Sequence, residues 1–107
     1  MAREQFQTLT EPMYYILLAL MEECCGVDIM DKVSELSTGR VKVGPGTLYA
    51  MLSKFEENEI IKRTKEEGRR KWYHITDNGL HMLMQEYERL QTMVEDGRRY
   101  FLKEKES

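Results

Sequence analysis

Hydrophobic positions recur along most of the chain at spacings that predict helices. The first helix is expected to begin after Thr10, a favourable N-cap, with Glu11 and Pro12 in its first turn. It should run through MYYILLALMEE to Glu23. Residues 13–21 are apolar on nearly all sides. This helix should therefore be covered on more than one side.

Glycines divide the next part of the chain. Gly26 should separate the first helix from a second one over residues 27–37, with Gly39 near its C-terminal cap. Residues 40–43 alternate polar and apolar side chains, which predicts a short strand. Four apolar side chains should face inward from the second helix: Ile29, Met30, Val33 and Leu36.

The third predicted helix has an unusual start. It begins with Gly44, Pro45 and Gly46, although Gly and Pro are the poorest helix formers. Proline is accepted at the first helical position, and a start without bulky side chains leaves the N–H groups open to an anion. The alternative is a simple tight turn. The helix should end near Asn58, and its inward residues at helical spacing are Leu48, Met51, Leu52 and Phe55.

Two strands and a long helix complete the pattern. Residues 60–65 and 71–75 are strand candidates around a charged turn at residues 66–70, and this arrangement predicts a hairpin. Thr76 should cap the last helix, which is expected over residues 77–103. The element order is that of a winged helix-turn-helix, in which the third helix enters the major groove of DNA.

The last helix carries an apolar repeat of 3.5 residues, the pattern by which helices pack in a coiled coil. A seam of three heptads outside a compact domain predicts a homodimer. A helix that folds back on its own domain is the alternative. Gly97 occupies one step of the repeat. The predicted dimerisation residues are Leu80, Leu83, Tyr87, Leu90, Val94 and Phe101.

Length and composition limit the class of protein. The chain has 107 residues, which suits one small domain with an appendage. The longest uncharged apolar run, residues 13–21, is too short for a membrane span, and no signal peptide pattern precedes it. The protein is therefore expected to be cytoplasmic. The fold class expected is mainly α with a small β-hairpin: a winged helix-turn-helix over residues 1–76 and a long dimerisation helix over residues 77–107.

The charge distribution changes this picture. The formal net charge is −3, but residues 40–74 carry nine Lys or Arg against five Glu, a net of +4, which leaves −7 for the remainder. A basic centre fits a surface that faces a polyanion, although an ordinary mixed surface gives the same count. The predicted DNA-binding residues are Lys42, Gly44, Gly46, Thr47, Tyr49, Ala50, Ser53, Lys54, Arg69, Arg70 and Lys71.

Three segments resemble the PadR family of transcriptional regulators: LTEPMYYILLAL, PGTLYAMLSKFEENEII and EEGRRKWYHITDNG. They lie at the family's separation and cover about two-thirds of the chain. The single C-terminal helix is similar to the family's short subfamily. The resemblance implies a dimeric winged-helix repressor, held together by its C-terminal helix and released from DNA by a ligand or a stress signal. It also supports Thr47 and Tyr49 in the recognition helix and the wing residues Arg69, Arg70 and Lys71.

Other functions have less support in the sequence. No arrangement of Ser, His and Asp, and no phosphate-binding loop, indicates an enzyme. His74, His81, Cys24 and Cys25 lack the paired spacing of a zinc site, so neither a metal nor another cofactor is expected. Whether Cys24 and Cys25 sense redox state stays open. The main alternative is a protein-interaction winged helix that binds no DNA.

An effector site is the last candidate. Methionine adapts to irregular ligands, and several methionines lie near the first and last helices. A small apolar or aromatic effector between these helices is expected, although ordinary core packing explains the same residues. The candidate pocket residues are Met13, Tyr14, Tyr15, Met84 and Met93.

Overall fold

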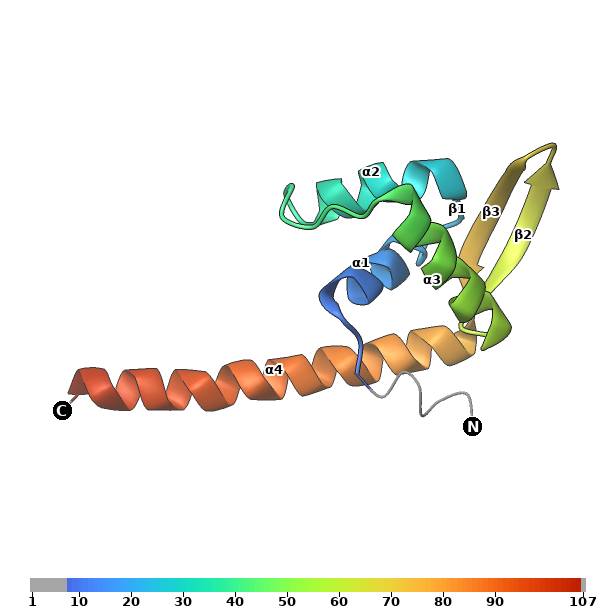
Figure 1. The fold of residues 1–107 in the computed structure, drawn as a ribbon. Helices are drawn as coiled ribbons and strands as arrows, with labels where there is room; N and C mark the ends of the chain where they lie inside the picture. Colours follow the sequence, from blue (N-terminus) through green and yellow to red (C-terminus); the bar gives the residue numbers. More distant parts are fainter. Residues whose placement is uncertain (1–7, 107) are drawn as a thin grey trace.

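The computed structural model describes residues 8–106. Residues 1–7 and Ser107, which fall in the two predicted regions 1–76 and 77–107, lie outside the described residues. Figure 1 shows a small helical domain, a hairpin that projects from it and one long helix that extends well past it. The elements are α1 (Glu11–Ala19), β1 (Cys24–Cys25), α2 (Gly26–Leu36), α3 (Pro45–Glu57), β2 (Ile61–Glu67), β3 (Arg70–Ile75) and α4 (Asp77–Glu106).

The first helix begins as predicted and ends earlier. The Thr10 hydroxyl accepts a hydrogen bond from the Met13 N–H, which confirms the N-cap. The prediction that the helix continues to Glu23 was wrong, because α1 ends at Ala19. The carbonyl of Leu20 instead accepts a hydrogen bond from the Ile75 N–H at 2.8 Å, so pairing with a distant strand stops the helix.

The sheet has one strand more than the predicted hairpin. Its order is β1-β3-β2, and both pairings are antiparallel. Cys24 lies opposite Tyr73, and Cys25 lies opposite Trp72. Two cysteines carry no strand signal of their own. They become a strand because β3 offers them backbone partners.

The strand predicted over residues 40–43 is absent, since no strand pairs with this segment. The predicted alternation of burial is nevertheless present, with Val41 and Val43 buried. The Ser37 hydroxyl, itself buried, accepts a hydrogen bond from the Val41 N–H at 2.9 Å and donates to the Val33 carbonyl. A serine side chain therefore takes the place of a neighbouring strand.

The second helix ends one residue before its predicted limit. Ile29 and Val33 are buried as predicted, whereas Leu36 is 48% exposed, so its inward placement was wrong. Leu36 is the last residue of α2, where the helix has already passed the core. Thr38 and Gly39 then adopt positive φ values of 55° and 79°, which lets the chain reverse towards α3.

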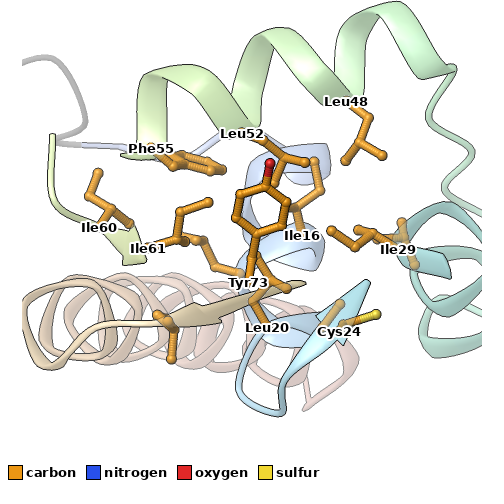
Figure 2. Packing of buried hydrophobic residues seen from close by; sticks show 14 of the residues in the cluster. Ile16, Leu20, Cys24, Ile29, Leu48, Leu52, Phe55, Ile60, Ile61 and Tyr73 are labelled. Atoms are coloured by element: carbon orange, nitrogen blue, oxygen red, sulfur yellow. The ribbon is translucent and has the colours of Figure 1, made fainter. Parts of the chain in front are cut away.

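The core lies between α1, α3 and the sheet. Figure 2 shows Leu48, Leu52 and Phe55 pointing from α3 towards apolar side chains of the other elements. Of these, Leu48 and Phe55 are fully buried, as is Ile16 of α1. The core is thus continuous from the first helix to the base of the hairpin, and it fixes which face of α3 remains outside.

The start of α4 is tightly fitted to this core. The Thr76 hydroxyl accepts a hydrogen bond from the Gly79 N–H at 3.0 Å and donates to the Ile60 carbonyl. A Cβ atom on Gly79 would lie 2.1 Å from the same Ile60 oxygen and 2.8 Å from the Ile75 side chain. Only glycine allows this approach, because backbone cannot move away as a flexible side chain can.

Candidate nucleic-acid interface

The helix α3 has one buried face and one exposed face. Its inner residues belong to the core described above, while the outer ones are exposed. This division follows from the 3.6-residue period, which places residues three and four apart on one side. All the side chains predicted to face DNA from this helix are exposed: Thr47, Tyr49, Ala50, Ser53 and Lys54.

The start of α3 is bare. Gly44 is the N-cap, with φ −77° and ψ 161°, and makes no side-chain cap hydrogen bond, and Pro45 follows in the first turn. Cβ atoms on Gly44 or Gly46 would meet nothing within 4 Å, and neither glycine has a positive φ. Nothing in the described residues therefore requires glycine at these two positions. The start of α3 therefore has no side-chain cap and has open space at both glycines, which suits an anion at the helix N-terminus.

The β2–β3 hairpin, called the wing from here on, projects beside α3 (Figure 1). Gly68 has a φ of 58° at the tip, a left-handed conformation that glycine adopts without strain. Arg69 and Arg70 are exposed, and Lys71 is half-buried at the base of the tip. Three consecutive cations thus lie on the projecting part of the molecule.

A pocket of about 150 Å³ lies between the wing and α3. The ring of Tyr49 lies over Gly26 at the start of α2, so that a Cβ there would be 3.3 Å from Tyr49 Cε1. Tyr49 nonetheless remains 43% exposed. Tyr49 therefore packs against the start of α2 and also presents part of its ring to solvent. The pocket is lined by Cys25, Gly26, Val27, Tyr49, Arg69, Arg70, Lys71 and Tyr73.

Ion pairing separates two groups of cations. Within residues 8–106, Lys32, Arg40, Arg63, Lys65, Arg89 and Arg99 each form an ion pair with a carboxylate. The five cations predicted to contact DNA form none among the described side chains, residues 8–103, and neither do Lys62, Arg98 and Lys103, so an unpaired charge does not by itself mark the interface. These five are Lys42, Lys54, Arg69, Arg70 and Lys71.

The predicted dimerisation residues divide between two environments. Leu83 is only 3% exposed and Leu80 packs against the core, so both are covered by their own domain. Leu90 is half-buried. Tyr87, Val94 and Phe101 are 55%, 66% and 70% exposed. Only the outer part of the seam is free to meet a second chain.

The candidate effector residues differ in how far they are exposed. Met13, Tyr14 and Tyr15 are partly buried against the core, whereas Met84 and Met93 are 54% and 55% exposed on α4. The helices α1 and α4 contact each other, and burial, followed by the nearby Tyr87, raises the pKa of Tyr14.

The two cysteines are both buried, and their thiols are free. Cys24 belongs to the apolar core, and burial raises the pKa of its thiol. Among residues 8–103, whose side chains the structure describes, no group of three or more His, Cys, Asp or Glu side chains is arranged to hold a metal ion. No helix within those residues is long and apolar enough to cross a membrane.

Three polar contacts connect segments of the fold without a recognisable signal in the sequence. Arg40 pairs with Glu11 and donates to the Tyr15 hydroxyl at 2.7 Å, which ties the start of α1 to the loop before α3. The buried Glu86 accepts hydrogen bonds from the Leu9 N–H at 2.9 Å and from Arg89. No local pattern marks such residues, because each partner is far away in sequence or belongs to a common helix-surface spacing.

The third contact is made by Arg63 of β2. Its guanidinium binds Glu56 of α3 and Glu66 of the wing, each at 3.2 Å. An arginine in a charged strand is usually a solvated surface residue, and that is how the sequence presents it. The structure shows it joining the two elements that form the candidate interface.

The amino-acid sequence matches a known protein family. Residues 16–85 match the transcriptional regulator PadR-like family. This match includes α3, the wing and the start of α4. The chain belongs to the PadR-like family of transcriptional regulators. No curated protein sequence matches the chain.

Solved structures agree with this fold. A PadR family transcription regulator from Clostridium difficile R20291 has a TM-score of 0.66 at 24% identity, covering 82% of this chain and 97% of that one. A transcriptional regulator from Clostridium thermocellum has a TM-score of 0.69 at 22% identity, over 81% of this chain and 86% of the other. A PadR-like regulator from Bacillus cereus has a TM-score of 0.60 at 26% identity, over 82% and 86%. The protein thus has the winged-helix fold of this family.

Proposed function

We propose that the protein is a sequence-specific DNA-binding repressor that acts as a homodimer on an inverted-repeat operator. The recognition helix α3 enters the major groove, where Thr47 and Ala50 contact base edges. Arg69, Arg70 and Lys71 of the wing neutralise backbone phosphates. Lys42, Ser53 and Lys54 add contacts at the edges of the helix. Two-fold symmetry places the half-sites about 10 base pairs apart or a multiple of that.

The observation that carries this proposal is the bare start of α3. Gly44 and Gly46 have open space where a Cβ would be, and neither needs a positive φ. Gly44 is the N-cap, where glycine is well accepted, but Gly46 lies inside the first turn, where glycine costs up to about 0.5–1 kcal/mol relative to alanine. Since no contact among the described residues requires glycine at position 46, a binding partner outside the chain explains it. Close approach of a phosphate to the helix N-terminus is a sufficient reason.

The second half of α4 supports the homodimer. Besides Val94 and Phe101, it exposes Met93 and Leu102, at 55% and 48%. These side chains lie along one hollow on the helix together with Gly97. Apolar surface of this kind marks a protein interface. A self-complementary pairing of two such helices gives the two-fold axis that an inverted repeat requires.

Release from DNA follows from the same geometry. The separation of the two recognition helices depends on how α4 and α1 meet their partners. A small apolar or aromatic ligand that inserts near Met13, Tyr14, Tyr15, Met84 and Met93 changes this separation. To switch from nearly all bound to nearly all released, the ligand must favour the released form by about 5.5 kcal/mol.

Gly46→Ala tests the proposal, because stability and DNA binding should change in opposite directions. Removing a helix glycine should stabilise the fold by up to about 1 kcal/mol. The added methyl group should weaken DNA binding by roughly 1.5–3 kcal/mol, the worth of a hydrogen bond to a charged group. Thermal unfolding and fluorescence titration with duplex DNA measure the two effects.

Glu57→Ala is the matched control, since Glu57 is exposed on the same helix but at its far end. This change should not weaken binding. If Gly46→Ala binds DNA as tightly as the unchanged protein, the start of α3 does not approach a phosphate. If the unchanged protein binds no duplex at all, the winged helix serves protein interaction instead.

A further inference from the structure

One arginine connects the recognition helix to the wing. Arg63 Nη2 lies 3.2 Å from Glu56 Oε1, in the last turn of α3, and Arg63 Nη1 lies 3.2 Å from Glu66 Oε1, in the wing. The side chains of Arg63 and Glu56 are 35% and 34% exposed, and that of Glu66 is 52% exposed. Burial acts to lower the pKa of Arg63, but the two carboxylates outweigh it, so the pKa of Arg63 is raised. The guanidinium is thus held between two elements of the interface.

The position of Arg63 along β2 matters, because the strand is irregular there. Arg63 lies opposite Tyr73, but Lys65 lies opposite Trp72, so the strand accommodates one extra residue, Thr64. Such a bulge bends a strand and increases its twist. The wing tip beyond the bulge therefore leaves the domain in a direction that the bulge and the adjacent contacts determine.

We infer that Arg63 is a positioning residue for DNA binding, which holds the wing at a fixed distance from α3 through Glu56. This inference rests on the proposed function. The nitrogens that meet Glu56 and Glu66 are not available to phosphates, unlike those of Arg69 and Arg70, which carry no ion pair in the described residues. Arg63 thereby acts on the DNA through the placement of these two cations.

Holding the wing in place before DNA binds reduces the conformational entropy that is lost on binding. A wing that moves relative to α3 has to be immobilised when it binds, and this loss of freedom reduces affinity. A partly exposed ion pair stabilises the fold very little. The contacts of Arg63 with Glu56 and Glu66, called the brace from here on, should therefore matter more for DNA affinity than for the melting temperature.

Glu56→Gln distinguishes a positioning role of Glu56 from a purely electrostatic effect of its charge, because the two predict opposite changes in DNA affinity. If only charge matters, removing a carboxylate near DNA should strengthen binding. If Glu56 anchors Arg63, the same change should weaken it. Glu57→Gln is the matched control: Glu57 is the next residue of α3, is exposed and forms no ion pair within residues 8–103. It removes the same charge without touching the brace.

The probe is a mixed-sequence DNA duplex of roughly 30 base pairs, about three helical turns. Relative to Glu57→Gln, Glu56→Gln should bind roughly two- to fivefold more weakly, the range that a surface ion pair allows. Arg63→Gln should show a similar loss, and the double variant should lose no more than Arg63→Gln alone. The slope of log affinity against log salt should stay unchanged in Arg63→Gln, whereas a phosphate contact would reduce it by about 0.9.

The only tryptophan of the chain gives a readout without DNA. Trp72 lies in the wing, directly past the bulge. Its time-resolved fluorescence anisotropy should show larger local motion in Glu56→Gln than in Glu57→Gln, and Arg63→Lys should restore part of the order. Equal affinity of the two glutamine variants, or a flatter salt slope for Arg63→Gln, would overturn the inference. Absence of DNA binding by the unchanged protein would instead overturn the proposed function.

Discussion

The first four turns of α4, residues 77–90, lie against the domain, while residues 91–103 extend past it (Figure 1). In the near part, Met82, Leu83 and Glu86 are 8%, 3% and 3% exposed, whereas Val94 and Phe101 in the far part are 66% and 70% exposed. Both parts carry the same apolar repeat. An apolar repeat therefore predicts which face of a helix is apolar, but it does not predict which surface covers that face.

Leu83→Glu should have the largest effect, because it places a charge inside the domain core. A buried charge without a partner costs more than about 4 kcal/mol, which is a large part of the stability of a small domain. The variant should be unfolded, with loss of helical circular dichroism. If it folds and merely becomes monomeric, Leu83 belongs to the dimer seam after all.

Gly79→Ala should come next, and it tests how closely the near part fits. The added methyl group collides with the Ile60 carbonyl at 2.1 Å, so either α4 or the loop before β2 has to shift. Overpacking of this kind costs about 1–3 kcal/mol. Urea denaturation measures the loss. Gly97→Ala is the control in the far part, where the new Cβ meets only Phe101 Cε2 at 3.6 Å and should not destabilise the domain.

The pair Val94→Glu and Phe101→Glu should have a smaller effect on the fold and a strong effect on assembly. Both side chains already face solvent in the single chain, so charge there leaves the domain core intact. The two charges should prevent two α4 helices from packing together. Light scattering should show a monomer and circular dichroism a folded chain. A stable dimer would place the interface elsewhere on the molecule.

Acid should weaken the attachment of the near part by the smallest amount. Hydrogen bonds from Arg89 lower the pKa of Glu86 against the opposing effect of burial, and the Leu9 N–H lowers it further. A lowered pKa in the folded state stabilises the protein above the ordinary pKa of glutamate, about 4.3. This stabilisation is lost as the pH falls through the lowered value.

The loss should disappear in Glu86→Gln, which has no charge to titrate at this position. Denaturation midpoints of both proteins between about pH 6 and pH 3 provide the comparison. The difference between the two proteins should shrink towards low pH. A difference that stays constant over this range would show that the charge of Glu86 does not hold the N-terminal segment to α4.

Local signals in the sequence were sufficient for most elements and for the outer face of α3. Thr10 and Thr76 were identified as caps and Pro45 as a first-turn residue, because capping depends on groups within one helical turn. Exposure of Thr47, Ala50 and Lys54 follows from the helical period alone. The contacts of these side chains with DNA remain predictions.

Contacts between distant residues were decided only by the tertiary structure. Cys24 and Cys25 form a strand because β3 lies beside them, and residues 40–43 do not, because Ser37 satisfies the Val41 N–H. The bridge from Glu56 through Arg63 to Glu66 likewise depends on how α3 and the wing meet in space. The physical reason is the same in each case. A backbone group or a charge accepts many partners, and the folded chain determines which of them is within reach.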